Sequence, residues 1–270
     1  MPIKGWTGYA PFYVANEMNL MDGERIEFVD KEDVEDVEDI MRYLEHVNGD
    51  FADAGPWLVD THVVARSKGV PVVAILKLDT SLAADALITH SNIKEFDQLQ
   101  GKKIAYQRLE PSHTMLLKLC AQSTKVAFDK NCKNTSPKGA TEMFQNGEVQ
   151  AAISYDPYLK QAENAMNQAN KLPAVHRLYT GKNLLDLKHP IVDILVVRED
   201  FLARHPERVK SLIKGWFRAL EILVNEEHPK HEIAVKHFCA FMDEYAGKRS
   251  EQPYDEHDFH ELTDLSLIHI

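Results

Sequence analysis

Acidic, aromatic and small polar side chains gather in four short segments that follow apolar runs of the sequence. These segments are Gly5–Tyr9, Ala54–Pro56, Leu109–His113 and Tyr155–Pro157. Carboxylates can pair with an amine or another cationic group, and aromatic rings can pack an organic body or sense a cation. Helix N-termini offer N–H groups and a partial positive charge to an anion. The segments therefore have the chemistry to bind a small polar or charged molecule.

The candidate ligand-binding residues come from these segments and from acids close to expected strand ends or crossings. Helix N-termini are expected at Gly55 and Pro56 and at Ser112 and His113, where an anionic head group could be held without Lys or Arg. The full set of candidate ligand-binding residues is Trp6, Thr7, Tyr9, Gly55, Pro56, Asp79, Ser112, His113, Tyr155, Asp156 and Asp193.

Several of these residues also have a purely structural explanation. Trp6 and Tyr9 belong to residue types that fill protein cores. Asp79 is equally suited to a turn or a helix cap, and Asp156, which precedes Pro157, is typical of a turn or an N-cap. The sequence leaves both explanations open.

Signatures of known catalytic chemistry do not occur in the sequence. It contains no Gly-x-Ser-x-Gly elbow, no P-loop, no His-Glu-x-x-His and no Gly-x-Gly-x-x-Gly. Glu110, Ser112 and His113 could suggest a nucleophile with its base, but a binding role or a helix start explains them more simply. The acidic and His-containing segment 255–260 has no second group of ligands at metal-binding spacing. We therefore expect no catalytic residue, no metal and no cofactor.

Composition and charge limit the partners of the protein. The 270 residues include 31 Lys and Arg against 42 Asp and Glu, and the net charge of −11 opposes binding to a nucleic acid. Cys120, Cys132 and Cys239 are too few and too scattered for a disulfide framework or a zinc site, although one bridge stays open. No apolar run approaches the roughly 20 residues that span a bilayer.

Expected strands alternate with expected helices along the chain, which favours an α/β architecture with mainly parallel sheets. In such sheets, ligands bind beyond the carboxyl ends of the strands. The expected strands are residues 25–29, 51–54, 70–76, 85–89, 103–106, 149–154 and 191–197. The expected helices include residues 57–67, 111–122 and 158–168 and most of the chain from 199 onward.

Five longer stretches carry a shared pattern of residues, and the pattern covers about residues 3–245. The stretches are Gly5–Ala15, Gly49–Gly55, Ile93–Ala105, Phe144–Tyr158 and Asp200–Lys210. Among them, Ile93–Ala105 matches the recurrent stretch I-K-x-x-x-D-L-x-G-K-K-I-A, and Asp200–Lys210 is like D-F-x-x-x-H-P-E-x-V-K. Taken together, they resemble the solute-binding proteins of ABC importers in the nitrate, sulfonate and taurine group.

The resemblance implies a two-lobed α/β fold of the periplasmic-binding-protein type II (Venus-flytrap) kind. Each lobe is then a mostly parallel sheet flanked by helices, with lobe 1 formed by residues 1–80 and 194–263 and lobe 2 by residues 81–193. The expected ligand is a small organic or oxyanionic solute, sulfonate-, taurine-, nitrate- or pyrimidine-like, bound in a cleft between lobes that close by a hinge motion. The implied partners are an ABC permease and its ATPase, and the expected state is a monomer.

Both ends of the chain depart from the family pattern. The family normally begins with an export signal, and Met1–Tyr9 has no basic region followed by an apolar one. A truncated N-terminus, a mature form, or a cytosolic or fused relative would each explain this. The short first strand favours truncation, and we expect a periplasmic or membrane-anchored, extracytoplasmic protein. Residues 264–270 resemble the translation of a sequencing adapter, and we expect them to be a non-native tail.

Two other functions stay open. A related fold makes the pyrimidine precursor of thiamine in a pyridoxal-phosphate-using synthase, but Cys132 stands alone here, without the cysteine-rich run of those enzymes. A ligand-sensing input domain of a signalling protein would keep the same cleft and would lack an export signal.

Overall fold

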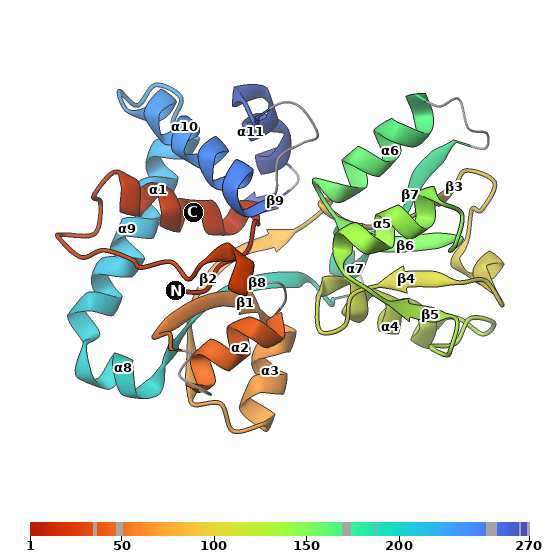
Figure 1. Ribbon diagram of the computed structural model, residues 1–270, viewed down its shortest axis with the longest axis horizontal. Coiled ribbons are helices and arrows are strands. Elements are labelled where there is room, and N and C mark those ends of the chain that lie inside the picture. The colour runs from red at the N-terminus through yellow and green to blue at the C-terminus, as the bar shows by residue number, and fades with distance from the viewer. Residues whose placement is uncertain are drawn as a thin grey trace. The chain divides into compact units, whose positions relative to one another are not determined.

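The computed structural model describes residues 1–34, 37–46, 51–168, 174–186, 188–246, 253–264 and 266–268 (Figure 1). The chain divides into two compact units: unit 1 is Met1–Thr80 with Val192–Ile270, and unit 2 is Ser81–Ile191. It passes from one unit to the other within β2 (Val72–Ser81) and within β8 (Ile191–Arg198). The predicted boundaries are those of two lobes that move relative to each other. A division into compact units does not test such a movement, so these boundaries stay predictions.

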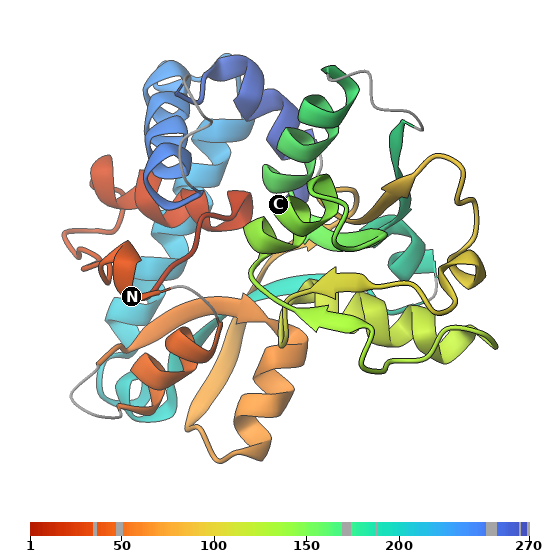
Figure 2. The same ribbon diagram turned by 45° about the vertical axis from the view of Figure 1, so that its right-hand side comes forward.

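Unit 1 is built on a four-stranded sheet with the order β1-β8-β2-β9. Strand β1 (Ala54–Leu58) runs antiparallel to β8, and β9 (Ser266–Ile268) lies beside β2. The helices α1 (Ala10–Glu17), α9 (Pro206–Val224) and α10 (His231–Phe241) pack against one another, as the two views in Figures 1 and 2 show. The other helical elements of unit 1 are η1 (Thr7–Tyr9), η2 (Lys31–Asp33), α2 (Val37–Glu45), α3 (Val59–Ser67), α8 (Glu199–Arg204), the π-helix η4 (Met242–Ala246) and α11 (Glu256–Asp264).

Unit 2 is built on a five-stranded sheet with the order β5-β4-β6-β3-β7. Strand β4 runs parallel to β5 and β6, whereas β3 runs antiparallel to β6 and β7. Ala86, Ile88, Phe144 and Leu159 contribute to a core of fully buried side chains between the sheet and its helices. The strands are β3 (Asp85–His90), β4 (Ile104–Tyr106), β5 (Cys132–Asn134), β6 (Ala151–Tyr155) and β7 (Val175–Thr180). The helices are η3 (Phe96–Leu99), α4 (Pro111–Gln122), α5 (Pro137–Gln145), α6 (Tyr158–Gln168) and α7 (Gly181–Asp186).

The direction of the strands corrects one expectation. The unit 2 sheet is mixed, and β1 pairs antiparallel with β8 in unit 1, so the prediction of mostly parallel sheets is wrong. Central strands that are buried on both faces are continuous apolar runs whether their neighbours are parallel or antiparallel. Composition alone therefore cannot distinguish the two directions.

The predicted strand at residues 25–29 is also wrong, because no ladder forms along it. Its one strand-like pairing is with Met1, whose N-terminal amine donates to Glu27 O and whose carbonyl accepts from Val29 N at 3.0 Å. Alternating side chains favour an extended backbone, but a strand also needs a second edge along its length.

Two expectations fall partly outside the described residues. Of the family-like stretch Gly49–Gly55, residues 49 and 50 lie outside them, as do residues 265, 269 and 270 of the expected non-native tail. Within that tail, Ser266–Ile268 forms the edge strand β9.

Two questions raised by the composition are answered within the described part of the chain. The cysteines at 120, 132 and 239 all lie there and carry free thiols. In the same residues, no helix combines the length and the apolar character needed to cross a membrane.

Neighbouring leucines on α4 test where the core of unit 2 lies. Leu116 is fully buried, whereas Leu117 is 42% exposed. Because a buried Leu→Ala change leaves a cavity, Leu116→Ala is expected to lower the free energy of unfolding by about 2–5 kcal/mol, as measured by urea denaturation. Leu117→Ala is the matched control and should change it by roughly 0.5 kcal/mol or less. Equal losses for the two variants would contradict this packing.

Candidate functional site

Unit 1 holds two buried carboxylates that accept hydrogen bonds from aromatic side chains. The indole Nε1 of Trp6 donates to Asp79 Oδ2 at 2.7 Å, and the hydroxyl of Tyr9 donates to Asp193 Oδ1. Trp6 precedes the short helical turn η1 and Tyr9 is its last residue, while the two acids lie near the end of β2 and the start of β8. We call Trp6, Tyr9, Asp79 and Asp193 the unit 1 carboxylate cluster.

Burial makes these hydrogen bonds important for folding. Asp79 is 0% exposed and Asp193 4% exposed, and a buried carboxylate is costly unless donors replace the water it has lost. The backbone at Gly8 comes so close that a Cβ added there would lie 1.7 Å from Asp79 Oδ2. Glycine at position 8 therefore allows the loop to approach the acid, and Thr7 beside it is buried as well.

Gly55 and Pro56 do not occupy the helix N-terminus that the sequence predicted. They lie inside β1, opposite Val196 and Leu195 of β8, and α3 begins only at Val59. That prediction was wrong because the antiparallel ladder extends the strand through Leu58. A contact of either residue with a ligand stays a prediction.

In unit 2, Ser112 and His113 do lie at a helix N-terminus, in the first turn of α4. The hydroxyl of Ser112 accepts a hydrogen bond from Gln107 N at 2.9 Å and donates to Gln107 O at 3.0 Å. His113 stacks on Tyr106 with ring centroids 5.3 Å apart, and its Nδ1 accepts from Leu109 N at 3.3 Å. The loop before α4 is thus closed by its own side chains.

Electrostatics keep His113 neutral near pH 7. Burial, followed by the charge of Arg108, lowers the pKa of His113 below its ordinary value of 6.5. Because Nδ1 accepts a hydrogen bond, the proton of the neutral ring is assigned to Nε2, which can serve as a donor. His113 and the N–H groups of the first turn together could bind an anionic group.

Sequence reasoning missed Gln107, because a glutamine after an apolar strand carries no recognisable signal. Its side chain is 8% exposed, and its Oε1 has no hydrogen-bond partner among the described residues. It adds a buried acceptor to the same loop.

Asp156 takes part in an ion-pair network within unit 2. Arg177 donates to both of its oxygens, at 2.8 and 2.9 Å, and to Glu163 and the carbonyl of Ala83. Asp156 Oδ1 also accepts from Lys160 N at 3.1 Å, as an acid at a helix N-terminus does. Tyr155 lies beside it at the end of β6, in an edge contact with the ring of Tyr158. The structural explanation of Asp156 thus has direct support, and its contact with a ligand stays a prediction.

Arg177 keeps its positive charge in this network. Burial alone lowers the pKa of Arg177, but the hydrogen bonds that Arg177 donates to Asp156 and Glu163, together with the charges of these acids, outweigh it and raise the pKa above its ordinary value. Arg177 was not among the predicted site residues, because the sequence around it predicts no strand at β7. Among the described residues, no group of three or more His, Cys, Asp or Glu side chains could hold a metal ion.

Solved structures show which class of fold the two units form. The periplasmic aliphatic sulphonate binding protein SsuA from Escherichia coli matches 99% of this chain and 84% of its own, with a TM-score of 0.71 and 18% identity. The periplasmic nitrate-binding protein NrtA from Synechocystis PCC 6803 matches 91% of this chain and 65% of its own, with a TM-score of 0.65 and 13% identity. The fold is therefore that of the two-lobed type II periplasmic solute-binding proteins.

Residues 6–231 match the model of the NMT1/THI5-like family, and the chain belongs to that family. The taurine-binding periplasmic protein of Escherichia coli (strain K12) is 27% identical over 152 residues, 56% of this chain and 45% of that protein. A putative aliphatic sulfonates-binding protein of the same organism is 28% identical over 121 residues, 44% of this chain and 38% of that protein. The matched regions thus span less than half the length of either relative, and these homologues are binding proteins rather than enzymes.

The Trp6–Asp79 hydrogen bond can be tested against a second buried tryptophan in the same unit. Trp6→Phe removes the indole donor and leaves Asp79 buried without it, whereas Trp57 Nε1 has no hydrogen-bond partner among the described residues. Both changes remove the same atoms, so we expect Trp6→Phe to lower the unfolding free energy by about 1–3 kcal/mol more than Trp57→Phe. Urea denaturation at pH 7 measures the difference, and equal losses would show that the indole donor contributes nothing.

The Arg177 network predicts a pH-dependent loss of stability. Arg177→Met leaves Asp156 and Glu163 without their cation, which we expect to cost about 3–5 kcal/mol at pH 7. Burial raises the pKa of Asp156 above its ordinary value of 3.8, with Arg177 opposing the rise. In the Arg177→Met variant, the Asp156 carboxyl therefore binds a proton in the folded state at a pH where it has already lost that proton in the unfolded chain. The loss of unfolding free energy should shrink as the pH falls toward about 4.5.

Arg204→Met is the control for this series. Arg204 pairs with Asp200 at 2.9 Å, but both side chains are about half exposed. Its removal should change the unfolding free energy by roughly 0.5 kcal/mol at either pH. A loss at Arg177 that is the same at pH 7 and pH 4.5 would contradict the electrostatic explanation.

Proposed function

We propose that this chain is the solute-binding component of an ABC importer. Its ligand would be a small organic or oxyanionic solute, sulfonate-, taurine-, nitrate- or pyrimidine-like. Family membership over residues 6–231 supports the proposal, because the candidate residues of both units lie inside the matched range. The sulfonate and taurine specificity of the homologues makes a sulfonate the first ligand to test.

One observation in unit 1 carries the proposal. The loop that holds Trp6 and Tyr9 is hydrogen-bonded to Asp79 of β2 and Asp193 of β8, the two strands by which the chain passes between its units. Any solute that contacts this loop would thereby act on both connecting strands. Such a linkage between ligand and hinge is what a binding protein that closes on its solute requires.

The chemistry of the separate clusters matches different parts of a solute. Carboxylates such as Asp79 and Asp193 suit an amine, whereas the first turn of α4, with Ser112 and His113, suits a sulfonate or another oxyanion. The net charge of −11 does not oppose this, because N–H groups at a helix end act over a few ångströms.

The proposed partners and location follow from the proposed function. An importer's binding protein delivers its solute to a permease that an ATPase drives, and it works as a monomer outside the cytoplasmic membrane. By their names both homologues are binding proteins, the second putatively, and the first is periplasmic. We therefore propose an extracytoplasmic location for this chain.

Ligand screening tests the proposal. Taurine, alkanesulfonates, nitrate, bicarbonate, pyrimidines and amines are added singly in a thermal-shift assay, and we expect a sulfonate to raise the melting temperature by several degrees. A solute at 100 times its Kd stabilises the folded state by about 2.7 kcal/mol. Titration calorimetry should then give one site per chain. A chain that no ligand stabilises but that turns over a pyrimidine or an ester would be an enzyme instead.

Paired histidine variants in unit 2 locate the site. His113→Ala should weaken binding of the identified solute at least tenfold, because it removes the Nε2–H donor beside the α4 N-terminus. His189→Ala, an exposed histidine of the same unit, is the control and should bind as the unchanged chain does. The unfolding midpoint of each variant, measured without ligand, shows whether weaker binding comes from a lost contact with the solute or from a less stable fold.

A further inference from the structure

Unit 2 carries two of the three cysteines, and the topology of its sheet brings them to the same end. Strands β4 and β5 are neighbouring parallel strands, and α4 lies between them in the chain (Figure 1). A helix between adjacent parallel strands returns the chain from the end of the first strand to the start of the second. Cys120 lies in the last turn of α4, and Cys132 is the first residue of β5. Both cysteines therefore lie where the helix ends and the next strand begins.

The two side chains also lie on the same face of this sheet. Cys132 stands opposite Ile104, which is two residues before Tyr106, so Cys132 shares a face with the ring of Tyr106. That ring stacks on His113 of α4, which identifies the face as the one that α4 covers. Cys120 follows His113 by about two helical turns and so lies on the same side of α4. Both thiols thus face the space between the helix and the sheet.

The segment between the two cysteines folds over this space. The ring of Phe128 packs edge-on against Tyr106, with centroids 5.4 Å apart, and Cys132 Sγ donates to Ala127 O at 3.9 Å. Burial, followed by the proximity of Cys132, raises the pKa of Cys120 to about 11. The two thiols are therefore within electrostatic reach of each other, as the topology and the register require.

The third cysteine has different surroundings. Cys239 lies in unit 1, where its Sγ donates to Asp255 O at 3.3 Å. Because the sequence has three cysteines in all, Cys239 has no second cysteine in its own unit. It can therefore serve as an internal reference for the reactivity of the other two.

We propose that Cys120 and Cys132 form an intramolecular disulfide when the protein meets a disulfide oxidant. One cysteine thiolate attacks a sulfur of the oxidant, which gives a mixed disulfide and releases one oxidant thiol. The second cysteine attacks the mixed disulfide and releases the other oxidant thiol. The two cysteines lose two electrons and two protons, the oxidant gains them, and one S–S bond forms for the one that breaks.

The new bond would join the last turn of α4 to the edge strand β5. Residues 127–130 of the intervening segment are exposed, so this segment can adjust as the bond closes. A cross-link over a short loop restricts the unfolded chain and stabilises the folded one. The extracytoplasmic location proposed above would supply oxidising conditions. Bond formation requires no solute, so its test succeeds or fails independently of the proposed function.

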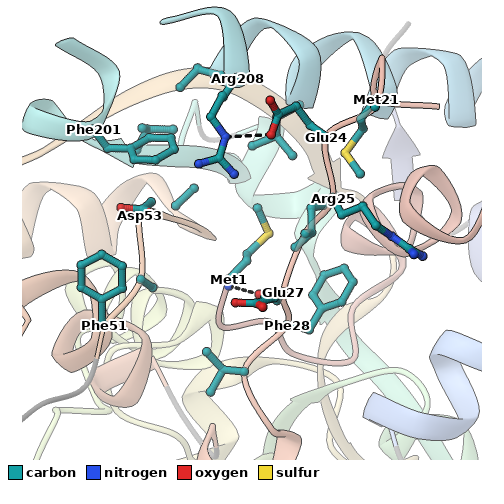
Figure 3. A pocket seen from close by; sticks show the side chains of 18 residues that line it. Met1, Met21, Glu24, Arg25, Glu27, Phe28, Phe51, Asp53, Phe201 and Arg208 are labelled. Atoms are coloured by element: carbon teal, nitrogen blue, oxygen red, sulfur yellow. Dashed lines mark hydrogen bonds and ion pairs between the residues drawn. The ribbon is translucent and has the colours of Figure 1, made fainter. Parts of the chain in front are cut away.

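Oxidised glutathione, a disulfide oxidant, tests the proposal on the full chain at pH 8. We expect the free thiols to fall from three to one and the intact mass to fall by two hydrogen atoms. A digest under non-reducing conditions should contain a peptide that links Cys120 to Cys132. A peroxide is unsuitable, because it also converts methionines to sulfoxides. Met1 and Met21 line the cavity of about 590 Å³ in unit 1 (Figure 3), and their oxidation would obscure the mass change.

Melting temperatures show whether the bond stabilises the fold. The oxidised chain should melt about 5 °C above the reduced chain. Cys132→Ser should melt at the same temperature with and without the oxidant, and its mass should not fall by two hydrogen atoms. Cys239→Ser is the matched control, because it keeps both members of the pair and should respond to the oxidant as the unchanged chain does.

The proposal is wrong if Cys120 and Cys132 both still react with an alkylating reagent after the oxidation. It is equally wrong if the linked peptides contain Cys239 or come from two different chains. A melting temperature that rises as much in Cys132→Ser as in the unchanged chain would show that the oxidant acts elsewhere in the protein.

Discussion

Burial of two carboxylates constrains unit 1 more than any other interaction described. Asp79 and Asp193 lie near the ends of strands that connect the two units, where their desolvation requires nearby donors. The indole of Trp6 and the hydroxyl of Tyr9 supply these, which fixes the loop before α1 against both strands. That loop needs glycine at position 8, because any Cβ would collide with the carboxylate of Asp79. The aromatic residues that attract a functional explanation thus also stabilise the fold of unit 1.

Unit 2 accommodates its own buried acid by a different route. Asp156 has a bidentate partner in Arg177, which lies 21 residues further along the chain on β7 and also binds Glu163. Charge compensation of this kind holds β6, α6 and β7 together. It leaves the neighbouring N-terminus of α4, with its neutral His113, as the part of unit 2 best suited to an anion. The loop at Asp156 therefore has a structural role, and the proposed binding role falls to the adjacent loop before α4.

Local signals explain which elements could be predicted. The helices at 111–122 and 158–168 form with the predicted bounds. The signals that predict them, a proline in or just before the first turn and apolar side chains at helical spacing, all lie within a dozen residues. Strands β5 and β7 were missed, since short or half-exposed strands carry little apolar pattern. The alternation at residues 25–29 favours an extended backbone. A strand also needs a ladder of hydrogen bonds, and that ladder depends on residues elsewhere in the chain.

By itself, the sequence determined the family, the α/β class and the set of polar and aromatic residues from which a site could be built, because these depend on residue type and spacing. Only the tertiary structure decided how those residues are used. It paired Trp6 with Asp79 and Tyr9 with Asp193, joined Asp156 to Arg177, and placed Gly55 and Pro56 inside a strand. The physical reason is that the energy of a buried charge depends on the donors that surround it, and these come from segments up to 184 residues apart.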